Sequence, residues 1–157
     1  MIDIEIPGFG EVHIEHLVAD FSGTLSLDGI LLPGIKERLN RLSEKININI
    51  LTADTHGKAK KQLEGIDARI NFLSDNTPED DFKENFVRKL GAESVAAVGN
   101  GNNDRKMLKA ARIGIAVCIG EGCAGDAYRA ADILVCRAED ALDLLLYPDR
   151  LKATLRF

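Results

Sequence analysis

Carboxylates, amides, a hydroxyl and a lysine stand just after, or close behind, short apolar runs in this sequence of 157 residues. The residues concerned are Asp20, Thr52, Asp54, Lys83, Asn100, Asn103 and Asp104. Oxygen ligands of this kind suit Mg²⁺, and a hydroxyl, backbone N–H groups and an ammonium suit the oxygens of a dianionic phosphate. The residue types therefore predict a site for a phosphate group and a magnesium ion.

Asp20 is the best-placed nucleophile of this set. The tight turn Phe21-Ser22-Gly23-Thr24 follows it, and backbone N–H groups of the turn, at Phe21 and Ser22, would surround whatever the Asp20 carboxylate attacks. The alternative is structural, because an Asp-x-x-Gly turn is common and Asp20 can simply cap it. Spacing alone leaves both interpretations open.

The hydrophobic pattern indicates which elements position these residues. Apolar alternation in 2–6 and 12–14, on either side of Pro7 to Gly10, predicts an antiparallel β-hairpin. Thr77 and Pro78 are expected as the N-cap and first residue of a helix over 78–90. Strands are further expected at 17–19, 46–51, 70–73, 94–98, 113–119 and 133–135, and helices from Pro33 and at 57–63, 104–111, 124–130 and 139–145.

Regular alternation of strand and helix predicts a parallel sheet with helices on both faces, a Rossmann-like three-layer α/β/α sandwich preceded by a hairpin. The length suits one domain over residues 1–157. Ligands bind beyond the carboxyl ends of the strands in such a sheet, where Asp20, Thr52 and Asn100 are expected. Lys83 lies one and a half turns into the following helix and can reach the same edge.

Composition excludes several classes of partner. Twenty basic and 25 acidic residues give a net charge of −5, and the largest basic cluster is Lys58-Ala59-Lys60-Lys61, so we expect no nucleic-acid binding. No apolar run approaches the ~18 residues that cross a bilayer, so we expect no membrane insertion. The acidic N-terminus lacks the features of a secretory signal, which favours a cytoplasmic location.

One glycine-rich segment is interpreted as structural. Gly120-Glu121-Gly122 follows the apolar run 113–117 and suggests a nucleotide-binding loop, but it lacks the spacing of a phosphate-binding fingerprint. A turn after a buried strand is the simpler interpretation.

The polar motifs resemble, in order, the four motifs of the haloacid dehalogenase (HAD) superfamily. The matching segments are Asp20–Ser26, Leu51–Asp54, Lys83 and Gly99–Asp104. The resemblance extends over about residues 17–146 and is closest to the phosphorylation domain of P-type ATPases, whose signatures read D-K-T-G-T-L-T, T-G-D and G-D-G-x-N-D. It implies a HAD-like fold and a Mg²⁺-dependent phosphatase or phosphotransferase with an aspartyl-phosphate intermediate.

The same resemblance implies roles for individual residues. Asp20 would be the nucleophile, and Thr52, with Ala53 in the same motif, would hold the phosphoryl group. Lys83 would neutralise charge on the nucleophile and on the phosphate. Lys58 lies nearer Thr52 in the sequence and competes for that role.

The resemblance also implies a set of metal ligands. Mg²⁺ would lie between the Asp20 carboxylate, the Ser22 carbonyl oxygen and the loop that contains Asn100 and Asp104. Asn103 would support the phosphate site through a hydrogen bond.

Two departures from the family pattern weaken the prediction of rapid turnover. Ser22 stands where HAD phosphatases carry an Asp that protonates the leaving group, and the loss of such a group costs about 10²–10⁴ in rate. Asn100 stands where the metal-binding loop usually begins with Asp, which predicts weaker Mg²⁺ binding. The alternatives are a non-catalytic phosphate-binding regulatory protein and a partner subunit of a transport ATPase.

The spacing of the motifs leaves no room for an additional domain. Residues 27–50 are only 24 in number, so a nucleotide-binding domain does not fit there, and only a helix and a short strand separate Thr52 from Lys83. We therefore expect a capless, open crevice that takes a phosphorylated small molecule or a phosphoprotein. By resemblance, such a crevice is compatible with a homo-oligomer in which a neighbouring subunit acts as a lid.

Overall fold

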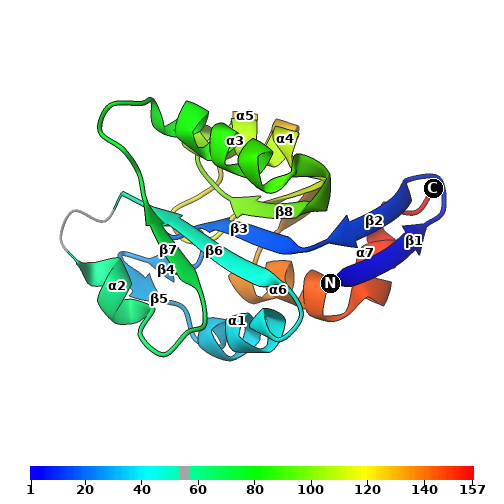
Figure 1. The fold of residues 1–157 in the computed structure, drawn as a ribbon, viewed down its shortest axis with the longest axis horizontal. Coiled ribbons are helices and arrows are strands. Elements are labelled where there is room, and N and C mark those ends of the chain that lie inside the picture. The colour runs from blue at the N-terminus through cyan, green and yellow to red at the C-terminus, as the bar shows by residue number, and fades with distance from the viewer. Residues whose placement is uncertain (54–56) are drawn as a thin grey trace.

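A six-stranded parallel sheet forms the centre of the molecule. The computed structural model describes residues 1–53 and 57–157, and its sheet has the strand order β10-β9-β8-β3-β6-β7 (Figure 1). All of its neighbouring strands pair in parallel. The strands are β3 (His16–Asp20), β6 (Asn47–Thr52), β7 (Arg69–Phe72), β8 (Val95–Gly99), β9 (Ile113–Val117) and β10 (Ile133–Val135).

Helices cover both faces of this sheet. One layer consists of α3 (Glu79–Leu90), α4 (Arg105–Ala110) and α5 (Gly125–Ala130), and the opposite layer contains α1 (Ile35–Ser43) and α6 (Ala138–Leu146) (Figure 1). The short α2 (Lys58–Gln62) lies beside the edge strand β7. This arrangement confirms the predicted three-layer α/β/α sandwich. None of the described helices combines the length and the apolar character that a bilayer crossing requires.

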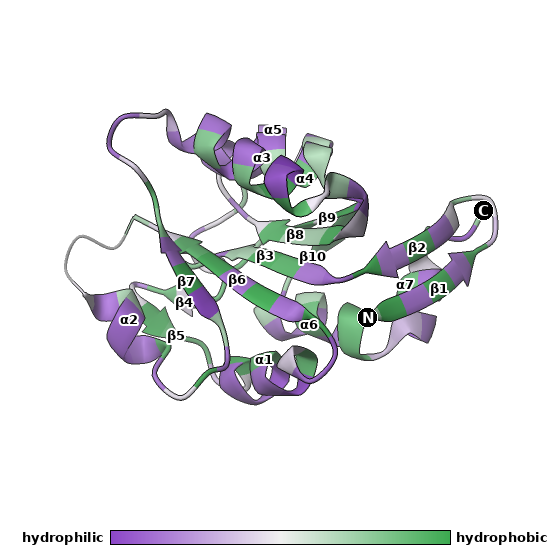
Figure 2. Ribbon diagram, viewed as in Figure 1, coloured by the Kyte–Doolittle hydropathy of each residue, from purple (hydrophilic) through white to green (hydrophobic). Residues whose placement is uncertain are grey.

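Burial explains why the central strands consist of short runs of apolar residues. Every residue of β8 and of β9 is buried, as expected for strands covered by helices on two faces. Figure 2 shows these hydrophobic strands between helices whose outer faces are hydrophilic. One group of buried side chains, including Leu17 and Leu142, faces α1 and α6, and a second, including Val18 and Met107, faces α3, α4 and α5.

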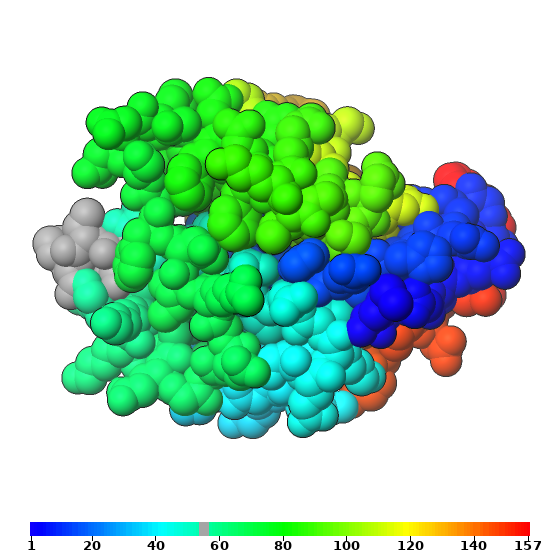
Figure 3. All heavy atoms as spheres, viewed as in Figure 1, coloured from blue at the N-terminus to red at the C-terminus, as the bar shows by residue number. Residues whose placement is uncertain are grey.

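The predicted N-terminal hairpin is confirmed. Strands β1 (Ile2–Ile6) and β2 (Gly10–Ile14) pair antiparallel with Ile4 opposite Val12. The hairpin extends from the amino-terminal edge of the main sheet and packs against α7 (Pro148–Leu155). Figure 3 shows N-terminal and C-terminal residues side by side at this end of the molecule.

Three local features differ from the sequence-based expectations. Helix α7 and a small antiparallel hairpin, β4 (Ser26–Leu27) with β5 (Ile30–Leu31), were not expected. Helix α3 begins at Glu79, and Pro78 instead of Thr77 is its N-cap, so that prediction was wrong. The reason is that Pro78 has an extended ψ of 136° while its carbonyl already accepts the first helical hydrogen bond, from Phe82 N at 2.9 Å.

Candidate active site

Three neighbouring strands deliver the predicted site residues to one edge of the sheet. Strand β3 ends at Asp20, β6 ends at Thr52, and β8 ends immediately before Asn100. Strand β3 lies between the other two, with Asp20 opposite Leu51 and Ala19 opposite Val98. The chain first adds strands on one side of β3 and later on the other, and such a switch point is where open α/β sheets bind ligands.

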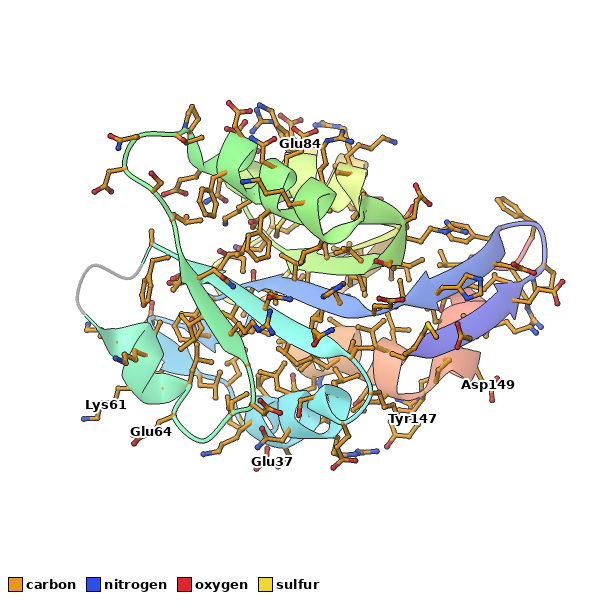
Figure 4. The ribbon with its side chains drawn as sticks, in the orientation of Figure 1. Glu37, Lys61, Glu64, Glu84, Tyr147 and Asp149 are labelled. Atoms are coloured by element: carbon orange, nitrogen blue, oxygen red, sulfur yellow. The ribbon has the colours of Figure 1, made fainter. Side chains whose placement is uncertain are left out.

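Lys83 reaches this edge from α3. Its side chain is fully buried, and its Nζ lies 2.8 Å from Asp20 Oδ1 and 2.7 Å from Asp104 Oδ1. The adjacent Glu84 lies on the outer face of the same helix (Figure 4). The competing Lys58 is an exposed residue at the start of α2. The structure thus brings Lys83 to Asp20, as the motif order predicted.

Asp104 anchors the loop that follows β8. It ends a short 3₁₀ turn, Asn102–Asp104, and its Oδ2 accepts hydrogen bonds from the backbone N–H groups of Asn100 and Gly101, both at 2.9 Å. The loop packs closely on this carboxylate, because a Cβ atom on Gly99 would lie 2.6 Å from Asp104 Cβ. With Oδ1 bound to Lys83, both oxygens of Asp104 are engaged.

Two buried carboxylates share one ammonium in this cluster. Burial and the charge of Asp104 raise the pKa of Asp20 to about 7, although Lys83 acts in the opposite direction. Burial lowers the pKa of Lys83, but the two carboxylates outweigh it and the net shift is upward. Lys83 is therefore charged at neutral pH, and the cluster carries one negative charge when both carboxylates are ionised.

The loop after Asp20 is held by its own backbone. Phe21 O accepts hydrogen bonds from the N–H groups of Leu25 and Ser26, and Gly23 N donates to Ser26 O at 3.0 Å. Phe21 N donates to Leu51 O at 3.2 Å, so this amide, expected to face a phosphate, already has a partner. The Ser22 side chain is exposed.

Oxygens suited to a cation meet at the side chain of Thr24. Its Oγ1 lies 3.4 Å from Asp20 Oδ2 and 3.1 Å from Asn100 Oδ1, while Asn100 Nδ2 donates to Gly122 O. One hydroxyl hydrogen can satisfy only one of these two oxygens at a time, so the other is available as a ligand. Carboxylate and amide oxygens of this kind are the ligands that Mg²⁺ prefers, and the Ser22 carbonyl stays a predicted further ligand. Asp104 was also predicted as a metal ligand, but both of its oxygens are already engaged, one by Lys83 and the other by the loop amides.

Among the remaining predicted residues, Thr52, Ala53 and Asn103 lie on segments that end or follow β6 and β8. Thr52 is buried at the end of β6, and Asp54 lies outside the described residues. Asn103 Nδ2 donates to Glu79 Oε2 at 2.6 Å and so joins its loop to the start of α3, while its phosphate-binding role stays a prediction. Ala53 borders a cavity of about 820 Å³, which lies between the end of β7 and the start of α3.

The sequence interpretation assigned no role to two residues that lie beside this centre. Thr24 lies inside the first motif but was not assigned a role, and its position four residues after Asp20 is the signal that was available. Glu121 was assigned to a structural turn, yet its carboxylate lies against Gly23. No local pattern marks it, because it comes from a segment that is distant in sequence.

Comparisons with known proteins agree with this architecture. No protein-family model matches the chain. The chain is 48% identical over 73 residues to the uncharacterized protein MJ0073 of Methanocaldococcus jannaschii, an alignment that covers 46% of this chain and 78% of that protein. It is 29% identical over 116 residues to the potassium-transporting ATPase ATP-binding subunit of Thermoplasma volcanium, covering 72% of this chain but only 17% of that subunit.

Solved structures show the same fold. A putative HAD family hydrolase from Streptomyces avermitilis superposes with a TM-score of 0.70 at 17% identity, covering 87% of each chain. The 3-deoxy-D-manno-octulosonate 8-phosphate phosphatase of Moraxella catarrhalis, solved with magnesium, phosphate and a sugar, gives a TM-score of 0.67 at 19% identity and covers 92% of this chain and 94% of that one. The chain therefore has the fold of these HAD hydrolases, and it belongs to the same family as MJ0073 of Methanocaldococcus jannaschii.

Proposed function

We propose that the chain is a Mg²⁺-dependent phosphohydrolase that forms a phosphoryl intermediate on Asp20. The observation that carries this proposal is the buried contact of Lys83 with Asp20 and Asp104 at the carboxyl end of β3. The cluster provides a carboxylate at a ligand-binding edge, with a fixed positive charge beside it. The magnesium and phosphate found in the Moraxella catarrhalis phosphatase support the same assignment.

Asp20 would act as the nucleophile through one carboxylate oxygen, and its other oxygen would remain for the cation. The attacking oxygen forms a new bond to the phosphorus atom, and the bond to the leaving-group oxygen breaks with its electron pair. Water then cleaves the acyl phosphate, which releases inorganic phosphate and restores the carboxylate. Lys83 remains beside Oδ1 and stabilises the negative charge that accumulates. A bound Mg²⁺ would supply further positive charge at the phosphoryl oxygens, held by Asp20, the Ser22 carbonyl and Asn100.

Ser22 makes this chemistry slow. Its exposed hydroxyl does not titrate near neutral pH, so the leaving group must take its proton from solvent. The same lack of a base slows the attack of water on the intermediate. We therefore expect a phosphoenzyme that persists, and activated leaving groups are the preferred substrates in vitro.

The surroundings of the site favour a leaving group without additional negative charge. The described lining of the cavity beside Ala53 includes Asp75 and Glu79 and no basic side chain. A phosphorylated small molecule or a phosphoprotein side chain fits this environment. We further propose that the protein is a single capless domain located in the cytoplasm, and that its open site can be covered by a second subunit.

The decisive experiment measures hydrolysis of p-nitrophenyl phosphate with and without Mg²⁺. Wild type should hydrolyse it only with Mg²⁺ and should form a hydroxylamine-sensitive phosphoenzyme, whereas Asp20→Ala should do neither. Asp149→Asn, on α7 at the far end of the molecule (Figure 4), is the matched control and should behave as wild type. Equal hydrolysis by wild type and Asp20→Ala would refute the proposal. Phosphate binding without turnover would instead favour the regulatory alternative.

A further inference from the structure

Glu121 belongs to the turn between β9 and α5, which the function proposed above does not use. The turn is closed by a hydrogen bond from Gly122 N to Ile119 O at 2.7 Å. Its neighbour Gly122 accepts the Asn100 side-chain amide through its carbonyl, at 3.1 Å. The turn is therefore attached directly to the loop that carries Asn100.

The carboxylate of Glu121 meets Asn100 above Gly23. A Cβ atom built on Gly23 would lie 2.3 Å from Glu121 Oε2, 2.7 Å from Asn100 Nδ2 and 3.2 Å from Asn100 Oδ1. The other carboxylate oxygen, Oε1, accepts a hydrogen bond from Asp28 N at 3.3 Å. Glu121 is thus held between the β4–β5 turn and the nucleophile loop, with Oε2 close to Gly23 and to the Asn100 side chain.

This carboxylate has no cationic partner within the described part of the chain. The ion pairs among these residues do not include Glu121. The buried ammonium of Lys83 is bound to Asp20 and Asp104. The Glu121 carboxylate therefore lies near the Asn100 side chain without a cation from these residues to balance its charge.

We propose that Glu121 supplies the acidic oxygen that Asn100 lacks, either as a direct ligand or through a water, and so completes the divalent-cation site. This inference rests on the proposed function, because it concerns the same cation. Mg²⁺ sites in proteins commonly use one or two carboxylates with neutral oxygens and waters. Asp20 and Glu121 provide the two carboxylates, and Asn100 and the Ser22 carbonyl provide the neutral oxygens. Asp104 remains committed to Lys83 and the loop.

The test measures binding of Mn²⁺, a paramagnetic substitute for Mg²⁺, by electron paramagnetic resonance, so that the readout does not depend on turnover. Glu121→Gln keeps the size of the side chain and its acceptor for Asp28 N but removes the charge. We expect it to raise the Kd for Mn²⁺ about 10- to 100-fold. Glu5→Gln removes the same charge from an exposed position on β1 and should leave the Kd unchanged.

A second variant tests whether the charge itself is what matters. In the Glu121→Gln background, Asn100→Asp returns a carboxylate to the loop and should restore Mn²⁺ affinity to within a few-fold of wild type. Wild-type affinity in Glu121→Gln, with loss of binding in Asp20→Ala, would overturn the role of Glu121 and leave the proposed function standing. Absence of Mn²⁺ binding in wild type would overturn both.

Discussion

Lys83 Nζ lies 2.7 Å from Asp104 Oδ1, and neither side chain is exposed to solvent. The same ammonium is shared with Asp20, so one buried positive charge serves two carboxylates. Breaking a buried ion pair from one side is costly, because the remaining charge has neither water nor a partner. The centre of the site is therefore also a determinant of the stability of the fold.

Replacement of Lys83 should destabilise the protein strongly. Lys83→Met keeps an unbranched side chain but leaves Asp20 and Asp104 without a cation, and we expect a loss of about 3–5 kcal/mol in the free energy of unfolding. Urea denaturation at pH 7.5 measures it. Lys89→Met, at an exposed position near the end of the same helix, is the control and should change stability by less than about 0.5 kcal/mol. If Lys83→Met lost no more stability than the Lys89→Met control, the charge of Lys83 would not be what stabilises Asp20 and Asp104 in the folded protein.

Asp20 should reduce stability at alkaline pH when no metal is present. Its pKa is about 7 in the folded protein against 3.8 in the unfolded chain, so the folded state holds more protons between these values. The free energy of unfolding therefore falls as the pH rises through this range. Asp20→Asn removes the charge, and we expect it to be more stable than wild type at pH 8 by on the order of 2 kcal/mol.

Thermal unfolding in the presence of a chelator checks this prediction. The gain in Tm should be several degrees at pH 8, given about 2–4 °C per kcal/mol for a chain of this size. At pH 5 the gain should be smaller, and it should vanish only below about pH 3.8, where Asp20 is protonated in the unfolded chain as well as in the folded protein. A gain that does not depend on pH would contradict the raised pKa.

Ser22→Asp should increase turnover on ordinary phosphomonoesters. The side chain is exposed at the edge of the site, so an added carboxylate is not penalised by burial and can exchange a proton with the leaving group. We expect a gain of about 10²-fold or more on alkyl phosphates, and a smaller one on p-nitrophenyl phosphate, measured as phosphate release with Mg²⁺. Ser22→Asn matches the size without the acid and should remain at the wild-type rate; an equal gain there would exclude acid catalysis as the cause.

Gly23→Ala should disturb the site more than the fold. Gly23 has a φ of 74°, and an added methyl group would meet the carboxylate of Glu121 and the amide of Asn100. Gly57→Ala, just before α2, is the matched control, because its φ is 70° but nothing lies within 4 Å of the added atom. Both variants should lose about 1–2 kcal/mol in urea denaturation through the left-handed backbone. Only Gly23→Ala should weaken Mn²⁺ binding, and equal affinities in the two variants would argue against a role for this contact.

The sequence predicted the sheet because its strands are buried on both faces. Continuous apolar residues such as Val95 to Val98 identify such a strand without any knowledge of its neighbours. The two-residue strands β4 and β5 are too short to show a period, and α7 is short and mixed in composition, so neither was expected.

Within the site, the motifs predicted the residues that lie at strand ends. They did not indicate Glu121, which only a tertiary contact brings to this place. Asp20, Thr52 and Asn100 follow apolar runs, and the register of β3 with its two neighbours brings them together. Glu121 reaches Gly23 only because the turn before α5 folds back over the nucleophile loop. That contact depends on the packing of segments about 100 residues apart, for which one sequence contains no local signal.

The hairpin β1–β2 and both chain ends occupy the edge of the sheet opposite the carboxylate cluster (Figure 1). A fusion protein or an immobilising tag attached at either end would therefore extend away from the crevice. Surface-tethered protein should consequently keep its crevice as accessible as that of protein in solution.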